Sequence, residues 1–218
     1  MYQSGLTITK KIEQATFSIT NALNNPDITT PLAVFGYDAV RLNEGKTLLD
    51  NLKLLQAKQK QEYIEQRAAT TDRDAIRTQI EAVYSKHLKL AKIAFKREPN
   101  ILLALEAVGQ RLRTYDGWKG QVTAFYNAAM NNQPIKDGLA RFNITETNLT
   151  DVQAQLTVLE TAEAQQKTEI GEAQQATLDR DTAMEALDDW MSDFQEVAKI
   201  ALEDNPQLLE ALGMIIKR

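Results

Sequence analysis

The chain of 218 residues contains no cysteine, which excludes disulfide bonds and thiolate metal sites. Only nine glycines and five prolines are present, which is too few for the many turns of an all-β fold. No stretch approaches 18 apolar residues, so we expect no membrane span. The first five residues carry no basic segment followed by an apolar run, so we expect no secretory signal and a cytoplasmic location.

The residues that are present favour helix, and the sequence contains an internal repeat. Gln, Ala, Leu, Glu and Lys dominate the composition, and these residues are good helix formers. The segment Asp72-Arg73-Asp74 recurs as Asp179-Arg180-Asp181, and the same shift of 107 superimposes Phe35 on Phe142 and Pro99 on Pro206. A repeat of this length indicates a tandem duplication. We therefore predict one helical repeat over 1–109 and a second over 110–218, packed as one unit.

Each repeat contains one long segment without a strong helix breaker. These segments, about 38–96 and 145–203, begin at the N-cap residues Asp38 and Thr145 and end before Pro99 and Pro206. Short helices are expected at 6–24, 114–131, 101–108 and 208–215. Gly36 and Asn143 are expected to end the short elements that precede the long segments, because Gly and Asn tolerate the left-handed conformation. The predicted fold is all-α, internally duplicated and elongated, a coiled-coil-like bundle with two long antiparallel helices of about 58 residues, or about 87 Å.

A hairpin is the alternative for each long segment. The only polar stretch that could form its turn is Thr70-Thr71-Asp72, and Thr71 becomes Leu178 in the second repeat, which weakens a capping motif there. Such a break would give two four-helix-type hairpin bundles. We favour the continuous helix and leave the hairpin open.

The two repeats carry charge of opposite sign. Residues 1–109 hold 15 basic and 12 acidic side chains, whereas residues 110–218 hold 10 and 18. Antiparallel pairing of the long helices would bring the basic stretch Lys86–Arg97 near Asp151, Glu160 and Glu163. The matching stretch of the second repeat is acidic, and the basic stretch has no interleaved aromatic residues that could stack on bases. Both observations argue against nucleic acid as a partner.

Four glutamates are the candidate metal ligands. Glu62 and Glu65 recur as Glu169 and Glu172, and a spacing of three places both carboxylates of a pair on one helix face. No Glu-x-x-His motif accompanies them, which argues against a di-iron site, so the cation expected here is a hard one such as Ca²⁺ or Mg²⁺. A solvated acidic face is the structural alternative, and it is the one we favour.

A polar waist is expected at the middle of each long helix. Its residues are Asp72, Arg73, Asp74, Asp179, Arg180 and Asp181. The functional interpretation is a polar site present twice, and the structural one is an ion-pair layer that sets helix register. We favour the structural interpretation.

The sequence gives little support for a catalytic activity. His87 is the only histidine and aligns with Phe194, so we expect a half-buried position for it and no catalytic role. No Gly-rich phosphate loop, Gly-x-Ser-x-Gly or dinucleotide fingerprint occurs. We therefore predict a non-enzymatic scaffold or adaptor without a cofactor, which binds a protein partner or itself. The alternative is a bundle that binds a metal or a small ligand of undetermined identity through its acidic central region.

Overall fold

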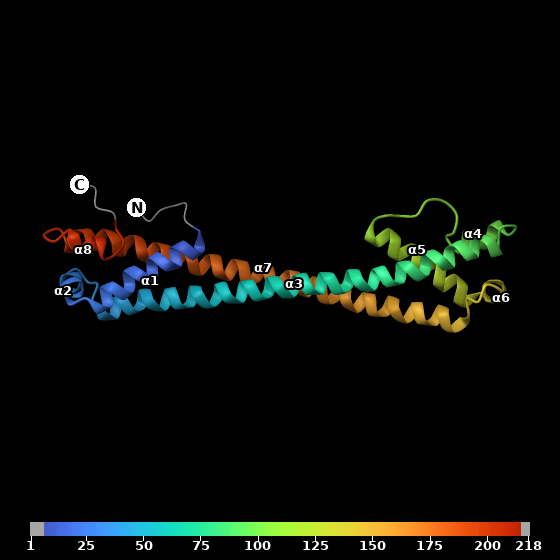
Figure 1. Cartoon of the computed structure of the whole chain (residues 1–218), viewed down its shortest axis with the longest axis horizontal. Helices are drawn as coiled ribbons and strands as arrows, with labels where there is room; N and C mark the ends of the chain where they lie inside the picture. The colour runs from blue at the N-terminus through green and yellow to red at the C-terminus, as the bar shows by residue number, and fades with distance from the viewer. Residues whose placement is uncertain (1–6, 215–218) are drawn as a thin grey trace. The chain divides into compact units, whose positions relative to one another are not determined.

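The computed structural model describes residues 7–214, and every regular element in that range is an α-helix (Figure 1). In chain order the helices are α1 (Ile8–Asn24), α2 (Pro26–Val34), α3 (Ala39–Ala94), α4 (Pro99–Ala104), α5 (Tyr115–Asn131), α6 (Gln133–Ala140), α7 (Glu146–Ala201) and α8 (Gln207–Glu210). The all-α prediction is confirmed, although Leu6 and Ile215, at the ends of two expected helices, lie outside the described residues. None of the described helices has both the length and the apolar character that crossing a membrane requires.

The two long segments are continuous helices of 56 residues each, α3 and α7. The hairpin alternative is therefore wrong. The hydroxyls of Thr70 and Thr71 donate to the carbonyl oxygens of Gln66 and Arg67, each at 2.9 Å, one helical turn earlier. A threonine bonded in this way belongs to a helix interior and does not cap a turn.

The connections into the long helices match the expected caps. After α2, Gly36 adopts φ +85°, and the Tyr37 N–H donates to the Leu32 carbonyl at 3.0 Å. After α6, Asn143 adopts φ +60°, and the Ile144 N–H donates to the Leu139 carbonyl at 3.3 Å. These bonds close a helix through a left-handed residue, a conformation that Gly and Asn tolerate best.

The first turns of α3 and α7 are capped by the two predicted side chains. Asp38 Oδ1 accepts from the Arg41 N–H at 2.9 Å, and Thr145 Oγ1 accepts from the Asn148 N–H at 3.3 Å. Each bond satisfies a backbone donor that has no partner within the helix. The sequence thus located both helix starts.

The helices form two compact units. Unit 1 comprises residues up to Ile64 and from Gly171 onward, and unit 2 comprises Glu65–Ile170. Each unit therefore combines part of α3 with part of α7 and draws on both predicted repeats. The bounds of α5 and α7 equal those of α1 and α3 shifted by 107, although the duplication itself stays a prediction.

Each unit has its own core. The core of unit 1 joins α1, α2, α3, α7 and α8, and its buried side chains include Ile19, Leu32, Leu42, Leu52, Leu187, Phe194 and Leu212. The core of unit 2 joins α3, α5, α6 and α7, and its buried side chains include Ile80, Tyr84, Phe125, Tyr126, Leu139, Leu149 and Leu159. Burial of these apolar surfaces is the main stabilising contribution in both units.

The two long helices pack on each other in antiparallel order. In unit 1, Gly45 near the start of α3 lies against Trp190 near the end of α7. In unit 2, Thr70 further along α3 accepts a hydrogen bond from Gln166, earlier in α7, at 3.2 Å. Partners on α7 therefore come earlier in the chain as α3 advances.

Candidate functional site

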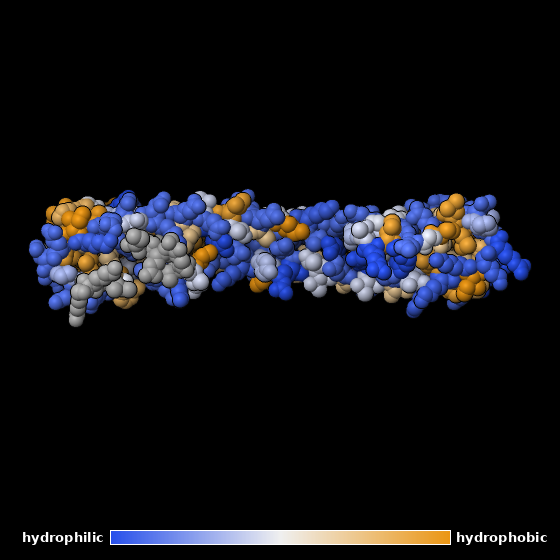
Figure 2. Space-filling view, turned by 90° about the horizontal axis from the view of Figure 1, so that it is seen from above, coloured by the Kyte–Doolittle hydropathy of each residue, from blue (hydrophilic) through white to orange (hydrophobic). Residues whose placement is uncertain are grey.

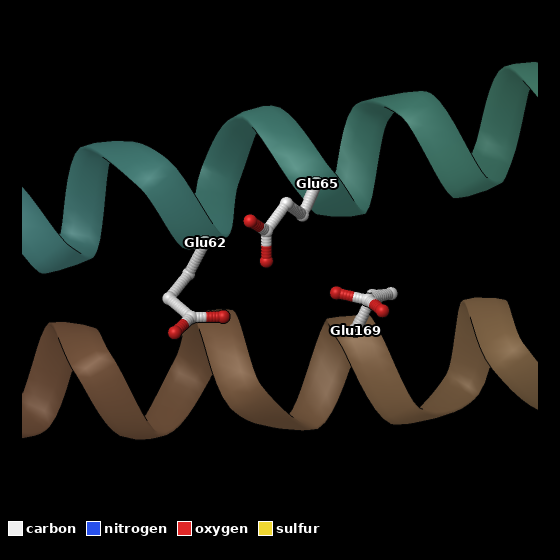
Figure 3. A group of neighbouring side chains, drawn as sticks. All are labelled: Glu62, Glu65 and Glu169. Atoms are coloured by element: carbon white, nitrogen blue, oxygen red, sulfur yellow. The ribbon is translucent and has the colours of Figure 1, made fainter.

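Two of the four predicted acidic residues meet within unit 2. Glu65 on α3 and Glu169 on α7 offer carboxylate oxygens that lie within 4.8 Å of each other. Figure 3 draws these two side chains together with Glu62, which stands one turn earlier on α3 and belongs to unit 1. Glu172 also belongs to unit 1. The acidic pair of unit 2 is therefore Glu65 with Glu169.

This pair borders a surface cavity of about 320 Å³. Asp72 adds a third carboxylate to the lining, and the small side chains Ala68 and Ala162 leave room between the acids. Gln165 donates a hydrogen bond to Glu169 Oε1. Glu169 Oε2 is buried and accepts no hydrogen bond from a described residue. A buried carboxylate oxygen without a donor is costly, so this atom is suited to bind a cation.

The donor set of this cavity fits a hard cation. Glu65, Asp72 and Glu169 supply carboxylate oxygens only, which Ca²⁺ and Mg²⁺ prefer over nitrogen or sulfur ligands. Three side chains cannot complete a coordination shell of six or more oxygens, so water would have to supply the rest. The arrangement can therefore hold an exchangeable ion but does not form an all-protein cage.

The first polar waist segment forms bonds within α3 and across to α7. Arg73 Nε donates to Asp74 Oδ1 at 3.0 Å, and Arg73 Nη1 donates to Gln166 Oε1 at 2.8 Å. The same guanidinium lies over the Tyr115 ring at 5.2 Å from its centroid. These contacts join three helices of unit 2, and the role of the segment in setting helix register stays a prediction.

The second waist segment makes similar local bonds in unit 1. Arg180 Nε donates to Asp181 Oδ1 at 2.9 Å, and the Gln175 side chain donates to Asp179 Oδ1 at 2.7 Å. Both bonds lie within α7. They order the side chains of the segment along one helix.

The only histidine has an aromatic partner. His87 is half-buried on α3, and its Nδ1 lies 2.9 Å from the Tyr126 hydroxyl on α5. Burial lowers the pKa of His87 because the charged imidazolium loses its hydration. The half-buried position matches the expectation, and the ring lies beside Tyr126, a core residue of unit 2.

Two acidic residues of α7 form ion pairs that the sequence argument did not anticipate. Glu163 binds Lys119 of α5 at 3.0 Å and Lys167 of its own helix at 3.1 Å. In unit 1, Asp188 of α7 binds Lys11 of α1. The acidic side chains of α7 are thus engaged by the short helices α1 and α5, which were left out of the sequence argument.

A polar cluster that the sequence did not indicate surrounds Glu81. Both carboxylate oxygens accept from Arg111 at 2.5 Å, and one also accepts from Trp118 Nε1 at 2.7 Å. The hydrogen bonds from Arg111 are the main reason that the pKa of Glu81 lies below its usual value. The partners are 30 and 37 residues away in the sequence, and no local spacing points to them.

Apolar side chains are exposed on both sides of the turn between α2 and α3. Val34 is 78% exposed, Phe35 is 50% exposed and Val40 is 69% exposed. Figure 2 shows hydrophobic surface at the end of the view where Figure 1 places α2. Between these residues Tyr37 is buried, with its ring 5.6 Å from that of Trp190. We call Val34, Phe35 and Val40 the apolar corner of unit 1.

The sequence and the fold were compared with known proteins. No protein-family model, curated protein or solved structure matches the chain.

Proposed function

We propose that the protein is a non-enzymatic helical scaffold or adaptor that binds a protein partner, or a second copy of itself, through the apolar corner of unit 1. The observation that carries this proposal is the exposure of Val34, Phe35 and Val40 around one turn. Exposed apolar residues scattered singly are normal on soluble proteins, whereas a group around one turn is typical of an interaction surface.

The geometry of the turn supports this role. Tyr37 packs on Trp190 and Phe194, with centroid distances of 5.6 Å to both rings, and so anchors the turn to the core. Gly36 allows the reversal through its positive φ. The apolar corner is thereby held in one conformation before a partner arrives, which lowers the entropy that association costs.

The test compares oligomeric state and partner capture between the native chain and a corner variant. Val34→Ser with Val40→Ser removes apolar surface but leaves Tyr37 in place. We expect the native chain to self-associate in sedimentation or to capture a partner by crosslinking from its host, and the corner variant to lose that association. Leu54→Ser is the matched control, because Leu54 is an equally apolar side chain of α3, 68% exposed and outside the corner.

Equal association of the native chain, the corner variant and the Leu54→Ser control would contradict this use of the corner. A homodimer in sedimentation would identify the second copy as the occupant. Captured protein that is lost only in the corner variant would identify a different partner. The far-ultraviolet circular dichroism of all variants should match, since each change is at the surface.

A second candidate function is binding of a divalent cation at Glu65 and Glu169. The observation that favours it is Glu169 Oε2, which is buried without a hydrogen-bond donor among the described residues. A cation that binds only the native state raises the melting temperature. We expect Ca²⁺ or Mg²⁺ to raise it, and Glu65→Gln with Glu169→Gln to abolish the shift. Glu185→Gln, at an exposed position of α7, should leave the shift intact.

A further inference from the structure

Unit 2 contains a second surface cavity, of about 570 Å³, apart from the one beside Glu65 and Glu169. It lies among α3, the segment after α4, and α5. Its charged and aromatic lining residues are Asp74, Arg77, Glu81, Arg111, Arg113 and Trp118. Its volume lies within the range of small-molecule sites. Three arginines in one cavity are notable in a chain whose net charge is −5.

The two acids of the cavity are already engaged. Glu81 accepts hydrogen bonds from Arg111 and Trp118 on both of its oxygens. Asp74 accepts from Arg73, whose Nε lies 3.0 Å from Asp74 Oδ1. The guanidinium groups of Arg77 and Arg113 make no hydrogen bond or ion pair with residues in the described range 7–214. Their N–H groups are therefore available to a ligand.

Arg77 is held in place without using its donors. Its guanidinium lies 5.0 Å from the centroid of the Trp118 ring and 5.6 Å from that of Tyr115. Stacking on aromatic faces fixes the plane of a guanidinium and leaves its N–H edges directed outward. The side chain is thus preorganised to form two parallel hydrogen bonds with an oxyanion.

The segment that carries Arg113 is also held. The buried Gln121 of α5 accepts from the Leu112 N–H at 2.9 Å and donates to the Gln110 carbonyl at 3.3 Å. Arg111, on the same segment, is fixed by its two bonds to Glu81. After Arg113, the Thr114 carbonyl accepts from the Trp118 N–H at 2.9 Å. Backbone on either side of Arg113 therefore has defined partners, and Arg113 itself lines the cavity.

We propose that this cavity binds the phosphate group of a small phosphorylated molecule. A carboxylate has two oxygens in one plane, whereas a phosphate monoester has three terminal oxygens and can engage the guanidinium forks of Arg77 and Arg113 from different directions. Leu112 and Trp118 provide apolar wall for the organic part of the ligand. The cavity is larger than a phosphate ion alone requires. This inference is independent of the apolar corner and of the acidic pair.

The experiment titrates the full chain with inorganic phosphate and with phenyl phosphate at constant ionic strength, with benzoate as the carboxylate comparison. Tryptophan fluorescence reports binding, because Trp118 lines the cavity and Trp190 belongs to the other unit. We expect saturable binding, with the highest affinity for phenyl phosphate, a lower one for inorganic phosphate and the lowest for benzoate. Arg77→Gln and Arg113→Gln should each lower the affinity for phenyl phosphate by about tenfold or more.

Two further variants keep the result decisive. Arg77→Lys retains the charge but loses the fork, so it should weaken binding nearly as much as Arg77→Gln. Lys89→Gln removes one positive charge from an exposed position of α3 in the same unit and should change the affinity by less than about twofold. Arg113→Gln alters an exposed side chain without a described partner, so it should not impair folding.

Three outcomes would overturn the proposal. One is a lack of saturable binding of either phosphate at concentrations up to about 10 mM. Another is equal affinity for benzoate and phenyl phosphate, which would show that the cavity does not select phosphate over carboxylate. The third is a loss of affinity in Lys89→Gln equal to that in Arg113→Gln, which would show that general charge and not the cavity attracts the anion.

Discussion

Replacing Gly45 by alanine should destabilise unit 1, although alanine is the better helix former. Gly45 lies inside α3, where the same change at an open position would stabilise the helix by about 1 kcal/mol. A Cβ atom built at Gly45 would stand 2.5 Å from Trp190 Cζ2, well inside van der Waals contact. The ring of Trp190 must therefore move, or the helices must separate.

The surroundings of Trp190 make that movement costly. The ring is buried, stacks on Phe194 at 5.2 Å between centroids, and meets the edge of Tyr37. Adding a methyl group to such a packed site costs about 1–3 kcal/mol, and more where aromatic rings must shift. The steric cost therefore equals or exceeds the propensity gain, and we expect a net loss in the free energy of unfolding of up to about 2 kcal/mol.

Gly171→Ala is the matched control. Gly171 lies inside α7 in the same unit, and a Cβ atom there would have no neighbour within 4 Å. The helix-propensity gain is common to both variants, so the difference between their unfolding free energies isolates the steric term. That difference should be about 1–3 kcal/mol, measured by urea unfolding with circular dichroism and tryptophan fluorescence.

A double variant sharpens the test. Trp190→Phe removes the ring that Gly45→Ala would strike, so the two changes together should cost less than the sum of the separate changes. The reasoning would be refuted if Gly45→Ala stabilised the chain as much as Gly171→Ala does. It would also be refuted if the costs of Gly45→Ala and Trp190→Phe were simply additive.

Three more predictions concern stability. Burial lowers the pKa of His87 below its usual 6.5, so the unfolded chain takes up the proton first as the pH falls. The free energy of unfolding should therefore decrease as the pH falls below about 6.5. His87→Phe should make this decrease smaller in urea titrations at several pH values. Glu81→Gln should cost on the order of 1 kcal/mol because it weakens the bonds from Arg111 at a partly exposed site, as a thermal melt would report. Leu52→Ala should cost about 2–5 kcal/mol in urea unfolding because the side chain is fully buried.

The candidate sites differ in how far the sequence could predict them. Glu65 and Glu169 were found because their spacing recurs in both repeats, and antiparallel packing of α3 and α7 brings them together. The cavity at Arg77 and Arg113 could not be found in this way. Its residues come from three segments, and the contact between Trp118 and Glu81 depends on how α5 packs against α3.

The sequence by itself determined the local structure. Prolines and the caps at Gly36 and Asn143 mark where helices end, and the lack of Gly, Pro and Asn between Asn51 and Pro99 predicts one uninterrupted helix. These signals act within a few residues along the backbone. Only the tertiary structure decided which halves of α3 and α7 share a core, and that Lys119 and Lys11 engage the acids of α7. Such contacts join residues far apart in the chain, and they depend on how whole helices pack their buried faces, which local patterns do not specify.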